Sequence, residues 1–340
     1  MPLTEAELLD LQADAMADDV EIDLEKMSLW TAEQATAYFE SGGTEEPSTG
    51  PAAPSPHPKL SKPSTADLAL WFPKYKPTGS TPKFRMICFH NAGSSESIYT
   101  GKGLRQKEDN PYVKHCQAAG GEMLACEMPG REARHKEPRF KGSSGLRQCA
   151  EALFPVLAPY LQEDVPFVYV GHSVGTWMLF EWCKLAAERG LPFPAQAIIS
   201  AFPHPACPEA ERPWNRAAGM ADGPFRDECR GWSINEVVFG EGTWKIYGPM
   251  MRDDFSLFDE YEYVAPPAFL PGGAFPFPIQ AYWATGDARA KEHLMAPWKN
   301  FTSKDFTLHE TGGNHLFFYD IPARAAYMEA AITRLPAGCK

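Results

Sequence analysis

The stretch that decides the fold spans residues 167–177 and reads FVYVGHSVGTW. It begins as a β-branched and aromatic run bounded by Pro166, a pattern typical of a buried strand. Gly171 and Gly175 then bracket a serine, and apolar residues at helical spacing follow. A strand that turns sharply into a helix at G-x-S-x-G forms a nucleophile elbow, in which the serine hydroxyl sits exposed on a strained turn. The pattern predicts that Ser173 is a catalytic nucleophile; a serine in an ordinary tight turn is the alternative.

Apolar runs and helical segments alternate on both sides of this motif. Strands are expected over residues 84–89, 123–128, 167–170, 195–200, 278–283 and 306–309, with a helix over 144–161. Strands that alternate with helices form a parallel sheet through right-handed crossovers. Because the expected strands are apolar, both faces of the sheet should be covered. The sequence therefore predicts an α/β fold, a mostly parallel sheet with helices on both faces.

Composition narrows the classes of function. The chain has 340 residues, enough to bury a sizeable core in one large domain or two. No apolar run approaches the ~20 residues that span a bilayer, and the first residues lack the features of a secretory signal or a transit peptide. The eight cysteines are scattered without metal-site spacing. We expect a cytoplasmic protein with reduced thiols, no membrane span, no metal and no cofactor.

The net charge of −12 is concentrated in one part of the chain. Residues 1–46 contain thirteen Asp and Glu and one Lys, and the remaining chain carries 31 acidic and 31 basic residues. The main body is therefore neutral, with an acidic leader attached. This distribution does not favour nucleic acid as a partner.

The leader and the segment after it differ in composition from the body. Residues 1–40 are expected to form an acidic helical extension, because Thr4 and Glu7 fit a capping box and an apolar stripe follows. Residues 41–64 are rich in Ser, Thr, Gly and Pro and are expected to be a linker. The packed domain is then expected over residues 65–340. The extension could dock a partner protein, or it could be a loosely packed appendage.

A long insertion is expected over about residues 203–276, between the fourth and fifth strands. It fits neither a strand nor a crossover, and it contains several Trp, Phe and Met residues. Insertions of this length in a compact domain often cover an active site. The sequence predicts a helical lid whose aromatic residues suit an apolar acyl chain; a helical subdomain with its own core is the alternative.

A serine hydroxyl is a weak nucleophile and needs a base within hydrogen-bond reach, usually a histidine. His315 is the best placed histidine, because it follows the last expected strand in the loop GGNHLFF. The other candidates are His172 beneath the elbow, His90 in the loop after the first strand, His309 within a strand and His293 on a helix surface.

An acid should orient this histidine, and two backbone N–H groups should stabilise the oxyanion. In the α/β-hydrolase fold the chain order is serine, acid, histidine, which favours Asp287 at the end of the fifth strand. The alternative acids are Asp253, Asp254 and Asp222. The expected oxyanion donors are the N–H groups of Val174 and Ala92, with Asn91 as the alternative to Ala92.

Five sequence blocks together resemble the type II thioesterases that act beside polyketide and nonribosomal peptide synthetases. The blocks are CFHNAGS at 88–94, PGREAR at 129–134, GHSVG at 171–175 with LFE at 179–181, PMMRDDF at 249–255 and GNHLFF at 313–318. They occur in the family's order and span most of the body. The acidic leader and the linker have no counterpart in the family's usual body.

The resemblance implies a fold, a reaction and a partner. It implies an α/β-hydrolase that hydrolyses an acyl thioester on the phosphopantetheine arm of a carrier protein, in trans, for editing or release. The enzyme would need no cofactor of its own, because the carrier protein brings the arm.

A basic run follows the second expected strand, near the edge of the sheet where such active sites open. It consists of Arg131, Arg134, Lys136, Arg139 and Lys141. It could steer an acidic carrier protein towards the site. The alternative is a solvated loop in which Arg131 and Arg134 make local salt bridges.

Two further functions stay open. The first is a soluble carboxylesterase or acyl-CoA hydrolase with the same fold and the same three side chains. The second is a non-catalytic docking or scaffold protein that keeps the fold, which the complete set of serine, acid and histidine disfavours.

Overall fold

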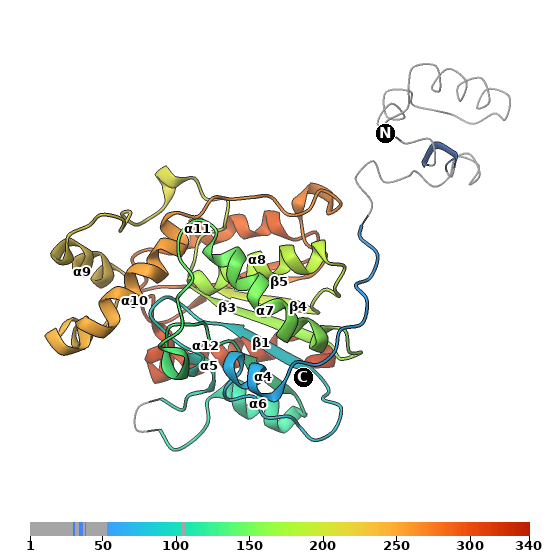
Figure 1. The fold of residues 1–340 in the computed structure, drawn as a ribbon, viewed down its shortest axis with the longest axis horizontal. Coiled ribbons are helices and arrows are strands. Elements are labelled where there is room, and N and C mark those ends of the chain that lie inside the picture. The colour runs from blue at the N-terminus through green and yellow to red at the C-terminus, as the bar shows by residue number, and fades with distance from the viewer. Residues whose placement is uncertain (1–29, 31–33, 37, 39–52, 104–105) are drawn as a thin grey trace. The chain divides into compact units, whose positions relative to one another are not determined.

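The computed structural model describes residues 30, 34–36, 38, 53–103 and 106–340 (Figure 1). Most of the predicted acidic extension and residues 41–52 of the predicted linker lie outside the described residues. Residues 53–64 form no regular element, and the first helix of the body begins at Thr65. The boundaries of extension and linker therefore stay predictions.

The chain divides into two compact units. One is Met1–Ala53 with Ala268–Gly272, and the other is Pro54–Pro267 with Gly273–Lys340. In the first unit the rings of Trp30 and Tyr38 meet edge to face, with centroids 5.1 Å apart. The second unit contains the sheet and every residue discussed below.

A parallel sheet forms the centre of the second unit. The strands are β1 Arg85–Phe89, β2 Glu122–Ala125, β3 Phe167–His172, β4 Gln196–Ser200, β5 Ile279–Ala284 and β6 Phe306–Thr311. In the described part of the chain they form a 6-stranded sheet in the order β2-β1-β3-β4-β5-β6, and each neighbouring pair is parallel. The predicted parallel sheet is confirmed. β2 ends at Ala125, earlier than predicted; beyond it the N–H of Cys126 still bonds to β1, and the N–H of Glu127, on the open edge, bonds to the carbonyl of Trp71.

Helices cover both faces of this sheet. The α-helices of the described body are α4 Thr65–Trp71, α5 Ser97–Thr100, α6 Pro111–Ala119, α7 Gly145–Leu161, α8 Val174–Glu188, α9 Asp222–Gly231, α10 Glu241–Asp259, α11 Glu292–Met295 and α12 Ile321–Thr333. Of these, α9 and α10 belong to the insertion between β4 and β5. No helix in the described part has the length and hydropathy needed to cross a bilayer.

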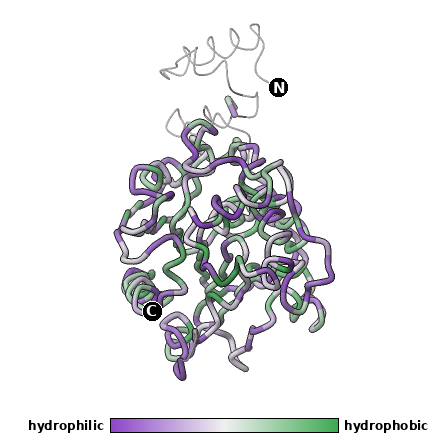
Figure 2. The backbone as a smooth tube through the Cα atoms, turned by 90° about the vertical axis from the view of Figure 1, so that its left-hand side faces the viewer, coloured by the Kyte–Doolittle hydropathy of each residue, from purple (hydrophilic) through white to green (hydrophobic). Residues whose placement is uncertain are grey.

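Alternate residues of β3 show how the two faces are covered. Val168 and Val170 belong to the core cluster that contains residues of α6 and α12. Between them, Tyr169 points to the other face and accepts a hydrogen bond from Trp182 of α8 at 2.7 Å. Figure 1 shows α7 and α8 side by side over the strands, and Figure 2 shows the apolar segments gathered in the interior. The predicted helices on both faces are confirmed.

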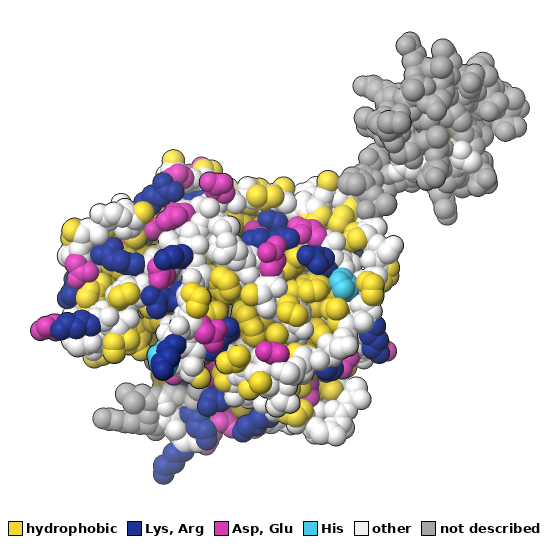
Figure 3. All heavy atoms as spheres, viewed as in Figure 1, with side chains coloured by type: hydrophobic (Ala, Val, Ile, Leu, Met, Phe, Trp, Pro, Cys, Tyr) yellow, Lys and Arg dark blue, Asp and Glu magenta, His cyan; other side chains and the backbone are white. Residues whose placement is uncertain are grey.

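Charge is balanced over the surface of the body. Figure 3 shows cationic and anionic side chains interspersed over one face, with apolar side chains between them. Many of the charged side chains form local pairs, such as Arg230 with Glu236 at 2.7 Å. This agrees with the equal numbers of acidic and basic residues in the chain after residue 46.

The turn from β3 into α8 has the strained geometry of the predicted elbow. Ser173 has φ 54°, a left-handed conformation that is costly for a residue other than glycine. Close packing explains the glycines around it. A Cβ on Gly175 would lie 2.2 Å from the carbonyl oxygen of Phe89, and one on Gly171 would lie 2.9 Å from the carbonyl oxygen of Gly175. The elbow passes so close to β1 that side chains do not fit.

We expect Gly175→Ala to destabilise the fold by about 3 kcal/mol, because the added methyl group meets a backbone oxygen that cannot move aside. Gly242→Ala is the matched control. Gly242 is an exposed glycine in the first turn of α10 with no atom near its would-be Cβ. The Gly242→Ala variant should raise the free energy of unfolding by about 0.5–1 kcal/mol, because alanine loses less conformational freedom on folding than glycine does. Urea unfolding of both variants measures the difference, and equal stabilities would show that the elbow has room to adjust.

Candidate active site

Ser173, His315 and Asp287 form a continuous chain of hydrogen bonds. His315 Nε2 lies 2.9 Å from Ser173 Oγ, and His315 Nδ1 lies 2.8 Å from Asp287 Oδ2. All three side chains are buried. They follow β3, β6 and β5, so they meet at the carboxyl edge of the parallel sheet, where ligands bind in folds of this type. The structure thus brings together the three side chains that the sequence predicts to act together.

Two glycines let the loops of the acid and the histidine touch. The N–H of Gly286 donates to the carbonyl of Gly313 at 2.8 Å. A Cβ on Gly286 would lie 2.8 Å from that same oxygen, and Gly313 has φ 93°. Because Asp287 and His315 follow these glycines closely, the contact between the loops places the carboxylate beside the imidazole.

The carboxylate of Asp287 is buried yet remains ionised. Burial would raise its pKa, but the His315 ring and the N–H groups of Arg289 and Ala290 outweigh burial and hold the pKa below its usual value. Those N–H groups donate to Asp287 Oδ1 at 2.8 and 3.2 Å. An ionised carboxylate accepts the Nδ1–H of His315, and this leaves Nε2 free to accept the proton of the serine.

The alternative acids have other partners. Asp254 pairs with Arg131 at 2.8 Å and Asp253 with Arg139 at 2.8 Å, while Asp222 accepts a hydrogen bond from Trp244. In the described part of the chain, none of these three carboxylates forms a hydrogen bond with a histidine.

The other candidate histidines do not contact the serine hydroxyl. His172 packs against Phe317 and Phe318 beneath the elbow, and burial lowers its pKa. His90 donates to the carbonyl of Asn91 at 2.8 Å, and burial together with the charge of Arg131 lowers its pKa to about 3. His309 lies in β6, and His293 is exposed on α11.

The loop after β1, residues 90–95, lies beside the nucleophile and is called the oxyanion loop below. Asn91 and Ala92 line the same small cavity as Ser173 and His315. Val174 is the first residue of α8, so its N–H belongs to the helix end that has no intrahelical partner. The side-chain amide of Asn91 donates a hydrogen bond to the carbonyl of Ala92 at 3.0 Å, which restricts the conformation of the loop.

The insertion between β4 and β5 covers the serine. The cavity beside Ser173 is about 20 Å³, room for about one water molecule. Its roof consists of Trp232, Ile234, Met251, Phe255 and Phe258. The ring of Trp232 meets the His315 ring edge to face, with centroids 4.6 Å apart. The predicted helical lid is present, and its inner surface is apolar.

A larger cavity of about 460 Å³ adjoins this small one. Both cavities are lined by Asn91, Ala92, Ile234, Met251 and Leu316. Ser233, Asn235 and Val238 of the insertion and Tyr319 line only the larger cavity, and Tyr319 is 58% exposed. The larger cavity therefore extends from the surface to the neighbourhood of the serine.

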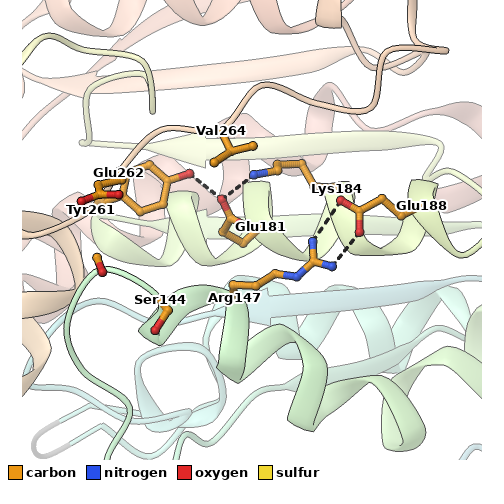
Figure 4. A pocket seen from close by; sticks show the side chains of 9 residues that line it. Ser144, Arg147, Glu181, Lys184, Glu188, Tyr261, Glu262 and Val264 are labelled. Carbon is orange, nitrogen blue, oxygen red and sulfur yellow. Dashed lines mark hydrogen bonds and ion pairs between the residues drawn. The ribbon is translucent and has the colours of Figure 1, made fainter.

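A separate cavity of about 350 Å³ lies between α7, α8 and the segment after α10 (Figure 4). Four of its charged side chains form two pairs. Glu181 accepts hydrogen bonds from Lys184 at 3.0 Å and Tyr261 at 2.5 Å, and Arg147 pairs with Glu188 at 2.6 Å. Figure 4 shows these pairs among the side chains that line the cavity. Among the described residues, no group of His, Cys, Asp and Glu is arranged to hold a metal ion.

The basic run after β2 is largely neutralised. Arg131 is buried against Asp254, Arg134 pairs with Glu137 at 2.7 Å, and Arg139 pairs with Asp253. The structure therefore favours salt bridges within the protein for Arg131 and Arg134, with Glu137 as the local partner of Arg134 and Asp254 as the distant partner of Arg131. Lys136 and Lys141 are the exposed lysines of this run, and Lys141 Nζ lies 3.7 Å from Asp253 Oδ1.

Sequence reasoning missed Arg289. Besides its backbone bond to Asp287, its guanidinium pairs with Glu228 of α9 at 2.8 Å and lies over the ring of Trp232, 5.7 Å from the centroid. Arg289 thus ties the loop of the acid to the lid. The available signal was its position two residues after Asp287, where a backbone N–H commonly reaches back to an aspartate carboxylate.

Comparisons with known proteins agree with this geometry. A family model described as "Thioesterase domain" matches residues 84–326. The gramicidin S biosynthesis protein GrsT of Aneurinibacillus migulanus is 25% identical over 246 residues, which are 71% of this chain and 85% of GrsT. The probable cadicidin biosynthesis thioesterase of Streptomyces griseus is 27% identical over 280 residues, 79% of this chain and 70% of that protein.

Solved structures share the fold. The thioesterase RedJ from the prodiginine pathway of Streptomyces coelicolor has a TM-score of 0.59 at 20% identity and covers 82% of this chain and 95% of RedJ. The type II thioesterase BorB from the borrelidin cluster has a TM-score of 0.59 at 24% identity and covers 78% of this chain and 96% of BorB. With the parallel sheet, the elbow and the lid, these likenesses confirm the α/β-hydrolase fold.

We expect Asp287→Asn to slow covalent labelling of Ser173 by a fluorophosphonate by about 10²–10⁴-fold, because an amide no longer holds the histidine in the useful tautomer. Asp253→Asn, which alters a surface ion pair on α10, is the control and should label at the wild-type rate. Equal rates for both variants would remove Asp287 from the reaction.

Proposed function

The chain belongs to the thioesterase domain family, and we propose that it is a type II serine thioesterase. It hydrolyses acyl thioesters on the phosphopantetheine arm of a carrier protein, acting in trans for editing or release. One observation carries the proposal: a serine, a histidine and an ionised carboxylate are hydrogen-bonded in series beneath an apolar lid. A buried constellation of this kind is suited to acyl transfer.

The reaction follows from the positions of these groups. Ser173 Oγ attacks the thioester carbonyl carbon while His315 Nε2 takes the hydroxyl proton. The N–H groups of Val174 and Ala92 stabilise the negative oxygen of the tetrahedral intermediate. When the carbon–sulfur bond breaks, His315 returns the proton to the sulfur, and the thiol of the arm leaves an acyl-enzyme.

A second half-reaction restores the enzyme. His315 takes a proton from a water molecule, whose oxygen attacks the acyl carbon. The ester bond then breaks, His315 gives its proton to Ser173 Oγ, and the carboxylic acid leaves. Asp287 stabilises the protonated imidazole in both halves without accepting its proton.

Several features support an acyl group on a long arm as the substrate. The roof over the serine is aromatic and aliphatic, which suits an acyl chain. The cavity of about 460 Å³ offers a path for an extended arm from the surface to Ser173. The names of the relatives place GrsT in gramicidin S biosynthesis and BorB in the borrelidin cluster, which supports a carrier protein of a biosynthetic assembly as the partner.

Docking belongs to the proposal as well. Lys136 and Lys141 are exposed and could attract an acidic carrier protein by long-range charge. The acidic extension, residues 1–40, is a second docking element that we keep as a proposal.

The test is intact mass spectrometry of a panel of acyl-carrier proteins incubated with wild type and with Ser173→Ala. The wild type should remove the acyl mass, and the variant should be at least about 10⁴-fold slower because it lacks the nucleophile. The Asp253→Asn variant, prepared in the same way as Ser173→Ala, is the control for activity lost during expression and purification. Equal clearance by wild type and Ser173→Ala would show that Ser173 is not the nucleophile.

The same acyl group offered on coenzyme A and as a p-nitrophenyl ester identifies the substrate class. We expect kcat/KM to be at least about tenfold higher for the carrier protein, since only it adds a docking surface. A preference for either free ester would favour a carboxylesterase or acyl-CoA hydrolase instead. Absence of all hydrolysis by a folded, fluorophosphonate-inert protein would favour a scaffold.

A further inference from the structure

We propose that Asp254 of α10 and Arg131 after β2 are positioning residues that hold the oxyanion loop in its working conformation. The lid then helps to build the site as well as covering it. This inference rests on the proposed function, because it concerns the N–H of Ala92 as an oxyanion donor.

Asp254 and Arg131 both contact the backbone of the oxyanion loop. Asp254 Oδ2 accepts the N–H of Gly93 at 2.7 Å and Arg131 Nη1 at 3.1 Å, while Oδ1 accepts Arg131 Nη2 at 2.8 Å. Arg131 Nη1 also donates to the carbonyl of Ser94 at 3.0 Å. The acid therefore accepts the N–H of Gly93, and the base donates to the carbonyl of the following residue, Ser94.

The same face of α10 also packs against the loop. Met251 precedes Asp254 by three residues, so both side chains lie on one side of the helix. Gly93 has φ 69°, and a Cβ on it would lie 2.1 Å from the sulfur of Met251. Gly93 is thus fixed by the hydrogen bond that its N–H donates to Asp254 and by close packing against Met251.

Holding Gly93 restricts Ala92. The carbonyl of Ala92 and the N–H of Gly93 belong to one planar peptide unit. Asp254 accepts a hydrogen bond from one end of this unit, and the amide of Asn91 donates to the other end. With this plane fixed at both ends, rotation about the Cα–C bond of Ala92 is restricted. The N–H of Ala92 belongs to the preceding peptide unit, whose carbonyl on Asn91 accepts the ring N–H of His90 at 2.8 Å. With both units held, the N–H of Ala92 keeps one direction.

Burying this ion pair costs desolvation free energy, which indicates that the pair does more than stabilise the fold. Asp254 is fully buried and Arg131 is 5% exposed. Two charges taken out of water are often no more stabilising than apolar residues of similar volume, whereas a bidentate pair fixes geometry. The neighbouring pair of Asp253 with Arg139 is about a quarter exposed and has no recorded contact with the oxyanion loop.

The position of the lid therefore matters for the chemistry. Asp254 and Met251 both come from α10, so a displacement of this helix removes both contacts from Gly93. The Ala92 donor is in place only while α10 is seated on the loop.

The test compares Asp254→Asn with Asp253→Asn, the same substitution one residue away on the same helix. An asparagine has one acceptor oxygen, so it cannot accept from Gly93 and pair with both nitrogens of Arg131. We expect Asp254→Asn to lower kcat by about 10–100-fold per titrated Ser173, with KM changed less than about twofold, as for a weakened oxyanion donor. Asp253→Asn should stay within about twofold of the wild type.

Two further readouts separate positioning from a general structural role. The affinity for butylboronic acid, which forms a tetrahedral adduct on the serine, should fall in parallel with kcat/KM. The midpoint of the acidic limb of kcat against pH should not move, since the bonds between Asp287, His315 and Ser173 are untouched. Equal kcat for both variants per titrated site, or an equal loss in both, would overturn the proposal.

A second pair of variants serves if Asp254→Asn does not fold. Arg131→Lys keeps the charge but loses the bidentate contact, and Arg139→Lys is its control on the same loop. We expect a lower kcat for Arg131→Lys alone, and equal values would overturn the proposal. Hydrolysis by wild type that does not depend on Ser173 would overturn the proposed function instead, which the Ser173→Ala variant detects separately.

Discussion

The hydrogen bond between the buried carboxylate of Asp287 and the ring of His315 is the interaction on which the site depends. Burial alone would favour the protonated acid, which cannot accept the Nδ1–H. The His315 ring and, after it, the backbone N–H groups of Arg289 and Ala290 offset that cost and hold the pKa of Asp287 below its usual value. The ring is then fixed with Nε2 towards Ser173. This arrangement depends on the close contact of the loops after β5 and β6 at Gly286 and Gly313.

The lid is connected to both halves of the site. On the side of the acid and the base, Trp232 packs against His315, and Glu228 pairs with Arg289. On the side of the oxyanion, Met251 lies against Gly93. The lid is therefore part of one packed unit with the loops that carry the chemistry. A cover that only excluded water would need the apolar roof but none of these specific contacts.

The charged residues show which contacts cannot be predicted from the sequence alone. The acidic extension and the basic run after β2 both stand out in the sequence as candidate docking surfaces. In the folded chain Arg131 pairs with Asp254, 123 residues along the chain, and Arg139 with the neighbouring Asp253, while Arg134 pairs with the nearby Glu137. The first two pairs join distant segments. A pairing of this kind leaves no periodicity or local motif, because it is made by crossing elements. The blocks PGREAR and PMMRDDF identified the segments but not the contact between them.

From its sequence alone the chain was expected to form the sheet and the elbow, with Ser173 and His315 as partners and Asp287 favoured among four acids. These follow from local rules: apolar runs mark strands, glycines mark close crossings, and parallel strands bring their following loops to one edge. Only the tertiary structure decided which acid faces the histidine, that Arg289 supports it, and that Asp254 reaches the oxyanion loop. The reason is physical, since burial and long-range packing select among several chemically equivalent carboxylates, and neither is encoded in any single stretch of the chain.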